Sequence, residues 1–130
     1  MKKFVALVAA PLLVLLAACG GSSANVVNLT TEEFASTIKN PGVVVLDVRT
    51  PGEFASGHIQ GALNIDVEGP DFQSQIATLD KSKEYAIYCR SGRRSIVAAN
   101  MMSDSGFTKL TNLESGIISW QGSGFPLVNN

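Results

Sequence analysis

Apolar runs and amphipathic stretches alternate along the chain from about residue 28, and this alternation predicts strands and helices in turn. The continuous, β-branched run VVVLDV at residues 43–48 is typical of a strand that is buried on both faces. The runs ALNID around Ile65, YAIYC at residues 85–89 and KLTNL at residues 109–113 predict three further strands.

The segments between these runs carry the start and stop signals of helices. Thr30 is expected to cap the first helix, because Glu33 follows three residues later and can reach back to it. The expected helices are TTEEFASTIK at residues 30–39, a turn PGEFAS at 51–56, PDFQSQIATL at 70–79, a longer helix from about Arg93 to Gly106, and ESGIISWQGSG at 114–124. Alternation of this kind predicts a single α/β domain with a central, mainly parallel sheet flanked by helices.

The first 18 residues have the three-part pattern of a secretory signal peptide. Lys2 and Lys3 make a basic start, residues 4–16 are almost wholly apolar, and LAAC follows at residues 16–19. The apolar run is shorter than the roughly 20 residues that a membrane-spanning helix needs. The alternative is a short membrane anchor that stays uncut.

LAAC resembles the lipobox of bacterial lipoproteins, in which the cysteine sulfur takes a diacylglyceryl group before cleavage leaves that cysteine as the first residue. The resemblance implies a lipid on Cys19, which would hold an exported domain on the extracytoplasmic face of the bacterial cell membrane. GGSSAN, which follows, is typical of a flexible tether. We therefore expect a signal peptide at residues 1–18, an acylated cysteine and tether at 19–27, and the globular domain at 28–128.

Removal of the signal peptide would change the balance of charges and thiols. The whole chain has 10 Lys and Arg against 11 Asp and Glu; loss of Lys2 and Lys3 leaves 8 against 11, a net charge of −3. Nucleic-acid binders are usually basic, so a nucleic-acid partner is not expected. Acylation of Cys19 would leave Cys89 as the one free thiol, which excludes an internal disulfide and draws attention to its reactivity.

The segment around Cys89, CRSGRRS, combines features that serve thiolate chemistry. It lies between a predicted strand and a predicted helix, and it holds three of the chain's four arginines: Arg90, Arg93 and Arg94. A glycine at the centre of the loop lets backbone N–H groups turn inward, as in anion-binding nests. Helix N-termini and neighbouring cations lower a thiol pKa from about 8.5 to between 3.5 and 7.5. A buried cysteine in a strand is often only a packing residue, but the joint pattern favours a nucleophile.

The same residues resemble the active-site loop of the rhodanese-type sulfurtransferases, C-R-x-G-x-R, through Cys89, Arg90, Gly92 and Arg94. The stretch LDVRTPGEFASGHIQGALNI resembles the family's upstream signature D-V-R-x-x-x-E-[FY]-x-x-G-H-I-x-G-A. LESGIISW resembles its closing L-x-G-G-x-x-x-W, except that Ser115 replaces the first glycine, a change expected to be remote from the sulfur. The resemblance extends over about residues 28–126.

This resemblance implies that Cys89 carries sulfane sulfur as a persulfide, which it takes from a donor such as thiosulfate and passes to a thiol or to cyanide. It also implies that no metal or organic cofactor takes part. The substrate-binding loop is expected to comprise Arg90, Ser91, Gly92, Arg93, Arg94 and Ser95. Its N–H groups would hold the persulfide and its basic side chains would help to bind a small sulfur-containing anion. Polysulfide or a protein persulfide would fit the same loop.

Three other functions are compatible with parts of this pattern. The domain could hold persulfide for an unidentified protein partner, or sense sulfur or redox state, without turnover of its own. Tyrosine-phosphatase loops place an arginine six residues after the cysteine, and Ser95 occupies that position here, so phosphatase activity is expected to be weak. An inactive interaction domain is disfavoured because the cysteine is intact.

Three polar residues outside the loop are candidates for supporting the crevice. Asp47 and Arg49 end a predicted strand and are expected to brace adjoining loops through charged hydrogen bonds, with Glu53 nearby. His58 is the one histidine and suggests a general base, but we favour a ring that hydrogen-bonds nearby backbone and fixes the turn. One histidine and one free thiol do not make a metal site.

Overall fold

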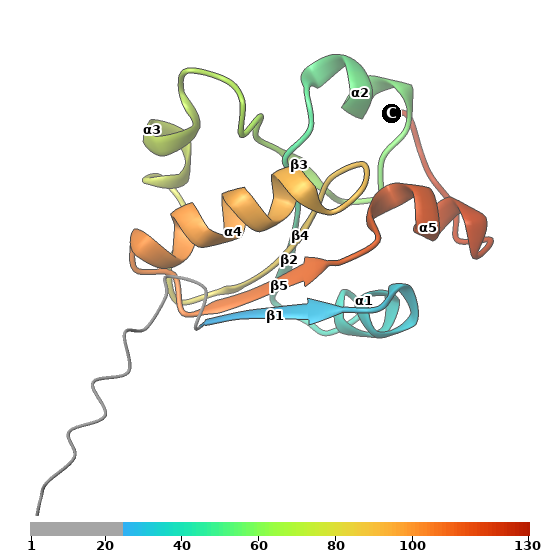
Figure 1. Cartoon of the computed structure of the whole chain (residues 1–130), viewed down its shortest axis with the longest axis horizontal. Helices are drawn as coiled ribbons and strands as arrows, with labels where there is room; N and C mark the ends of the chain where they lie inside the picture. Colours follow the sequence, from blue (N-terminus) through green and yellow to red (C-terminus); the bar gives the residue numbers. More distant parts are fainter. Residues whose placement is uncertain (1–24) are drawn as a thin grey trace, which may run out of the picture.

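Five strands form one parallel sheet in the order β1-β5-β4-β2-β3 in the computed structural model, which describes residues 25–130 (Figure 1). All four strand pairs are parallel. The strands are β1 (Val26–Leu29), β2 (Val43–Asp47), β3 (Leu63–Asn64), β4 (Glu84–Tyr88) and β5 (Lys109–Leu113). The expectation of an α/β domain with a central parallel sheet is confirmed.

The edge strand β1 is not among the strands that the sequence predicts. It pairs in register with β5 from Val26, opposite Leu110, to Leu29, opposite Leu113. Val26 and Val27 therefore belong to the sheet, although the expected tether included both. The run VVNL is apolar at three of its four positions, but it is short and directly follows GGSSAN, so the predicted tether extended through Val27. Cys19 and the expected signal peptide lie outside the described residues.

The helices lie where the sequence predicts them, with shorter bounds for most. They are α1 (Thr31–Thr37), α2 (Pro51–Ser56), α3 (Phe72–Ile76), α4 (Arg93–Asp104) and α5 (Gly116–Gly122). Thr30 caps α1 as expected, since its side-chain oxygen accepts a hydrogen bond from the Glu33 amide at 3.2 Å. No helix of residues 25–130 has the length and apolar character that crossing a membrane would require.

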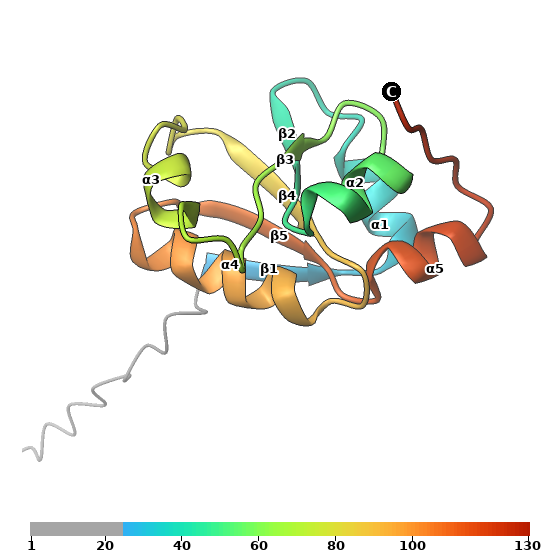
Figure 2. The same cartoon turned by 90° about the horizontal axis from the view of Figure 1, so that it is seen from above.

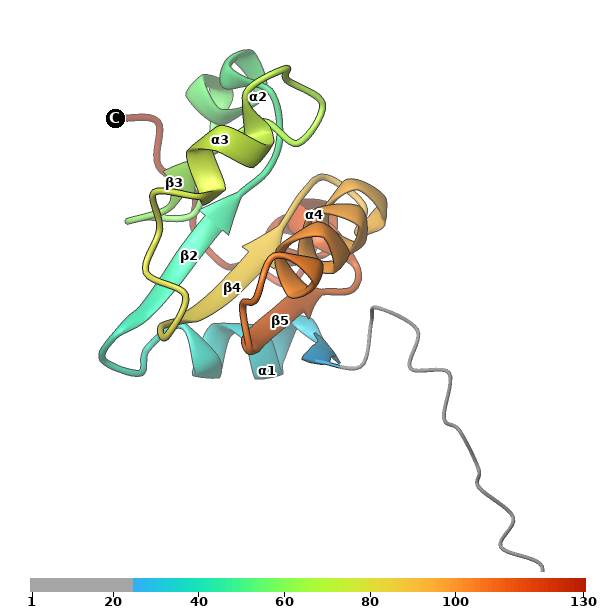
Figure 3. The same cartoon turned by 90° about the vertical axis from the view of Figure 1, so that its left-hand side faces the viewer.

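Two hydrophobic layers cover the sheet, and Figure 3 shows α1 and α4 on opposite sides of it. Residues of α3 and α4 pack on one face and residues of α1 and α5 pack on the other. Side chains of β4 alternate between these layers, because successive residues of a strand point to opposite faces. Tyr85, Ile87 and Cys89 belong to the α4 layer, whereas Ala86 and Tyr88 belong to the α1 layer.

The short helix α2 lies beyond the carboxyl ends of the strands, as Figures 2 and 3 show. None of its side chains is buried. Thr50 and Glu53 form a capping box at its start, and Pro51 occupies its first turn. Polar contacts rather than a packed apolar face therefore hold α2 at this end of the sheet, where ligands bind in parallel α/β folds.

Candidate active site

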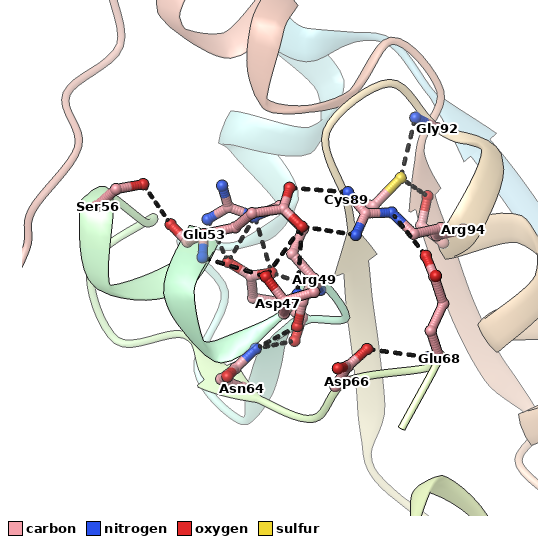
Figure 4. Close-up of polar contacts among 12 residues, drawn as sticks. Asp47, Arg49, Glu53, Ser56, Asn64, Asp66, Glu68, Cys89, Gly92 and Arg94 are labelled. Atoms are coloured by element: carbon pink, nitrogen blue, oxygen red, sulfur yellow. Dashed lines mark hydrogen bonds and ion pairs between the residues drawn. The ribbon is translucent and has the colours of Figure 1, made fainter. Parts of the chain in front are cut away.

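Cys89 lies at the carboxyl end of β4, and a loop of three residues connects it to α4 (Figure 4). The loop closes because Gly92 adopts φ of +98°, a left-handed conformation that favours glycine. This turn aims the Gly92 amide at the cysteine sulfur, at a distance of 3.1 Å. The hydroxyl of Ser95, in the first turn of α4, lies 3.3 Å from the same sulfur. The sequence predicted both groups as part of the loop.

The surroundings of the sulfur favour its negative form. Burial by itself raises the pKa of the Cys89 thiol, because Cys89 is 1% exposed. Hydrogen bonds from the Ser95 hydroxyl and from the amides of Ser95, Gly92 and Ser91 outweigh burial, so the pKa of Cys89 is lowered from its ordinary value. The positive end of the α4 dipole acts in the same direction. A cysteine with a lowered pKa is a candidate nucleophile, because the thiolate is the reactive form of the side chain.

The turn after β5 forms hydrogen bonds with the backbone of the loop. The amides of Ile117 and Ile118 donate to the carbonyl oxygens of Cys89 and Arg90, at 2.9 Å and 3.3 Å. A Cβ atom on Gly116 would lie 2.1 Å from the Arg90 carbonyl oxygen, so only glycine fits there. Ser115, beside it, has φ of −94°, which suits any residue. The closing motif thus touches the loop, although the replacement at Ser115 leaves its conformation unstrained.

The three arginines of the loop differ in their environments. Arg94 forms a two-pronged ion pair with Glu53 of α2, with N–O distances of 2.7 Å and 2.9 Å (Figure 4). Its Nε atom also lies 3.6 Å from a carboxylate oxygen of Glu68. Arg90 and Arg93 are exposed, and neither joins an ion pair among residues 25–130. The loop is cationic as expected, but the carboxylates of Glu53 and Glu68 offset the charge of Arg94.

Glu53 has a larger part in the site than its sequence position suggests. The ion pair with Arg94 is the main cause that lowers the pKa of Glu53 to about 2, with burial opposing and the Thr50 contacts assisting. Glu53 is therefore a carboxylate at every physiological pH. Glu53 was expected only to accompany Asp47 and Arg49 as a structural residue, and Glu68 had no expected role.

Asp47 and Arg49 form the brace that the sequence predicts. Arg49 donates to both carboxylate oxygens of Asp47, and its Nη2 also donates to the Gly57 carbonyl at 2.7 Å. The side-chain amide of Asn64 donates to the carbonyl oxygens of both residues, at 3.1 Å and 2.9 Å. These buried bonds connect the end of β2 to β3 and to the loop after α2. No contact joins them to the Cys89 sulfur.

His58 makes a hydrogen bond to nearby backbone, as its sequence position between two glycines predicts. Its Nδ1 lies 2.7 Å from the Phe54 carbonyl oxygen, and its ring stacks on the Phe54 ring. Its backbone pairs with Val128 near the carboxyl end of the chain. His58 therefore fixes the turn after α2. Within the described part of the chain, no three His, Cys, Asp or Glu side chains gather as a metal site would require.

A shallow hollow of about 270 Å³ adjoins the first turn of α4. Its lining combines two apolar side chains with two cations and one anion: Val67, Val97, Arg93, Arg94 and Glu68. Val97 is 51% exposed, so it presents an apolar surface to the hollow. A larger hollow of about 430 Å³ lies near Trp120 and Phe125, away from the loop.

Together, the parallel sheet and the cysteine loop at its carboxyl edge define an α/β domain with a candidate nucleophile where a strand meets a helix. The family model described as the rhodanese-like domain matches residues 30–123. The chain belongs to the rhodanese-like domain family, as the resemblance in its sequence implied.

Several relatives of the chain carry sulfurtransferase names. A sulfurtransferase from Allochromatium vinosum is 36% identical over 86 residues, which cover 66% of this chain and 78% of that protein. The thiosulfate sulfurtransferase GlpE of Stutzerimonas stutzeri is 34% identical over 90 residues, which cover 68% of this chain and 80% of that protein. Among solved structures, a rhodanese-related protein from Thermoplasma volcanium is 31% identical with a TM-score of 0.71, covering 80% of this chain and 99% of that one.

Proposed function

We propose that the domain is a sulfurtransferase that moves sulfane sulfur from thiosulfate or a similar donor to a thiol or cyanide acceptor through a persulfide on Cys89. The observation that supports this most directly is the sulfur of Cys89, which hydroxyl and amide donors surround and whose pKa is lowered despite burial. The names of the relatives point the same way.

The reaction divides into two displacements at sulfur. The Cys89 thiolate attacks the outer sulfur of thiosulfate, the S–S bond of the donor breaks, and sulfite leaves with the electron pair. In the second step, cyanide or a thiolate attacks the outer sulfur of the Cys89 persulfide, and the cysteine leaves as a thiolate. The N–H and O–H groups that donate to the Cys89 sulfur stabilise its thiolate. They therefore also make Cys89 a good leaving group, so one set of donors serves both steps.

Intact-mass measurement of the purified domain tests this proposal. We expect a gain equal to one sulfur atom after incubation with thiosulfate, and loss of that mass when cyanide is added. Cys89→Ser should show no gain with any donor. A variant without Cys89 that still transferred sulfur from thiosulfate at the wild-type rate would contradict the assignment.

A persulfide carrier without rapid turnover is the second candidate, and the enclosure of Cys89 favours it, since its side chain lies beneath the loop and is 1% exposed. Both candidates load one sulfur on Cys89. Release separates them: a sulfurtransferase transfers the sulfur quickly to cyanide or to free thiols, whereas a carrier keeps it until a partner protein is added.

We also propose that the domain is exported and held on the membrane by lipid on Cys19. The support is the LAAC motif after an apolar run, followed by GGSSAN. Fractionation of a bacterium that produces the full chain should place it in the membrane fraction, with the added mass of acyl chains. Cys19→Ala should remove that mass, and a wild-type chain without acyl groups would contradict this proposal.

A further inference from the structure

Arg94 and the hollow beside it indicate which donors the loop prefers, if the sulfur transfer proposed above takes place. The planar guanidinium of Arg94 offers two parallel donors, the geometry that receives a carboxylate or an oxyanion. Those donors already bind Glu53, at 2.7 Å and 2.9 Å. A doubly charged oxyanion such as thiosulfate reaches them only by displacing this carboxylate.

A second carboxylate strengthens this obstacle. A carboxylate oxygen of Glu68 lies 3.6 Å from Nε of Arg94, so two negative charges face the one positive charge of Arg94. Glu53 is in addition fixed in place, because it accepts hydrogen bonds from the amide and the hydroxyl of Thr50, at 3.4 Å and 3.1 Å. Displacement of Glu53 therefore also disturbs the start of α2.

The hollow next to Arg94 has apolar walls, which an inorganic anion cannot use. Val67 and Val97 provide apolar walls, while Arg93 and Glu68 provide one charge of each sign. Its volume of about 270 Å³ lies just below the ~300–1,000 Å³ of sites for drug-sized ligands, so it suits a molecule of amino-acid size. In charge and polarity, Arg93 complements the carboxylate of an amino acid, Glu68 its ammonium group, and the two valines a short aliphatic stem.

We propose that this hollow binds the organic part of an amino-acid persulfide, and that Glu53 makes such persulfides better donors than thiosulfate by occupying Arg94. The Cys89 thiolate attacks the outer sulfur of R–S–SH and the S–S bond of the donor breaks. The inner sulfur leaves with the electron pair as RS⁻, and the outer sulfur stays on Cys89 with its proton. The reacting sulfurs carry at most one negative charge, so the reaction proceeds with the Glu53–Arg94 pair intact.

The test measures the rate constant for loading of Cys89 by cysteine persulfide and by thiosulfate, from intact mass against time. In Glu53→Gln, which keeps an acceptor oxygen for Thr50, we expect loading from thiosulfate to rise about tenfold and the preference for persulfide over thiosulfate to fall accordingly. Glu68→Gln should shift the preference in the same direction by a smaller factor. Glu68 is 63% exposed in its side chain, so this variant carries little risk to the fold.

Val97→Phe tests the hollow itself. The larger ring fills the space between Val97 and Val67, so the preference for cysteine persulfide over thiosulfate should fall about tenfold. Val27→Phe is the matched control, since Val27 is 56% exposed on the edge strand β1 and lies outside the hollow. It should leave both rate constants unchanged.

Three results would overturn the inference. Slower loading from thiosulfate in Glu53→Gln would mean that Glu53 positions Arg94 for catalysis, and an unchanged preference in that variant would mean that the ion pair has no influence. An unchanged preference in Val97→Phe would mean that the hollow binds no donor. If Cys89 of the wild-type domain takes sulfur from neither donor, the proposed function fails as well, whereas loading with unchanged preferences refutes this inference alone.

Discussion

The hydroxyl oxygen of Ser95 lies 3.3 Å from the sulfur of Cys89, so the first turn of α4 touches the candidate nucleophile through a side chain as well as through its dipole. Ser95 is fully buried, which keeps this hydroxyl from rotating into solvent. The contact is one of those that outweigh burial and lower the pKa of Cys89. The charge of the sulfur therefore depends on a residue six positions away.

We predict that Ser95→Ala raises the pKa of Cys89, because burial, which raises the pKa, remains while one stabilising hydrogen bond is lost. At a fixed pH below that pKa, the thiolate fraction falls. The measurement is the rate of alkylation of Cys89 by iodoacetamide against pH, whose midpoint should move to higher pH.

Ser91→Ala is the control for this experiment. The Ser91 side chain is exposed, and its contribution to the thiolate comes from the backbone amide, which the substitution keeps. Its midpoint should coincide with that of the wild type. A midpoint in Ser95→Ala equal to or below the wild-type value would show that the hydroxyl does not stabilise the thiolate.

Arg94→Ala should slow the loading of Cys89 by thiosulfate about tenfold or more, because Glu53 and Glu68 then face the site without a compensating charge. The free energy of unfolding should change by no more than about 1 kcal/mol, since the ion pair is partly exposed to solvent. Rates of mass gain and urea unfolding measure the two effects.

The double variant Arg94→Ala with Glu53→Gln should recover part of the lost rate. Equal rates in the single and double variants would contradict this explanation.

The extent to which the site follows from the sequence depends on how far apart its residues lie along the chain. Cys89, Gly92 and Ser95 fall within seven residues, so local rules for a strand, a glycine turn and a helix start are enough to place them together. Asp47 and Arg49 are two positions apart, and their bracing contact was likewise predicted. In each case, a single element or turn fixes the geometry.

Contacts between distant segments were not predictable in the same way. Glu53 and Arg94 are separated by 41 positions, and they meet because α2 lies over the carboxyl end of the sheet. Nothing in the local pattern distinguishes a carboxylate that caps a helix from one that also binds an arginine. The strand β1 was not predicted for a related reason, since its partner β5 lies more than 80 residues later and only one of its own four residues is buried.

Gly92→Ala should destabilise the domain and abolish sulfur loading. Its φ of +98° is strained for any residue with a Cβ atom, and that atom would lie 2.0 Å from the Glu114 carbonyl oxygen. Strain of this kind costs about 1–3 kcal/mol before the clash is counted. Thermal unfolding and intact mass measure the outcome. Gly122→Ala, where a Cβ atom meets nothing within 4 Å, should be as stable as the wild type or more so, and a similar loss in both variants would contradict the role of the Gly92 turn.

Asp47→Asn should cost about 3–5 kcal/mol in the free energy of unfolding, because it leaves the guanidinium of Arg49 buried without its counter-charge. Asp47 is fully buried and Arg49 is 5% exposed, so water does not replace the lost carboxylate. The measurement is urea unfolding at neutral pH.

Asp71→Asn is the matched control, since Asp71 is exposed and its side chain caps no helix. It should change the free energy of unfolding by less than about 0.5 kcal/mol. Replacement of both partners, Asp47→Leu with Arg49→Met, should cost less than Asp47→Asn alone, because no charge then remains buried. An equal or greater cost for the double variant would show that the bonds from Arg49 to Gly57 and from Asn64 to the backbone, rather than the unpaired charge, carry the stability of this brace.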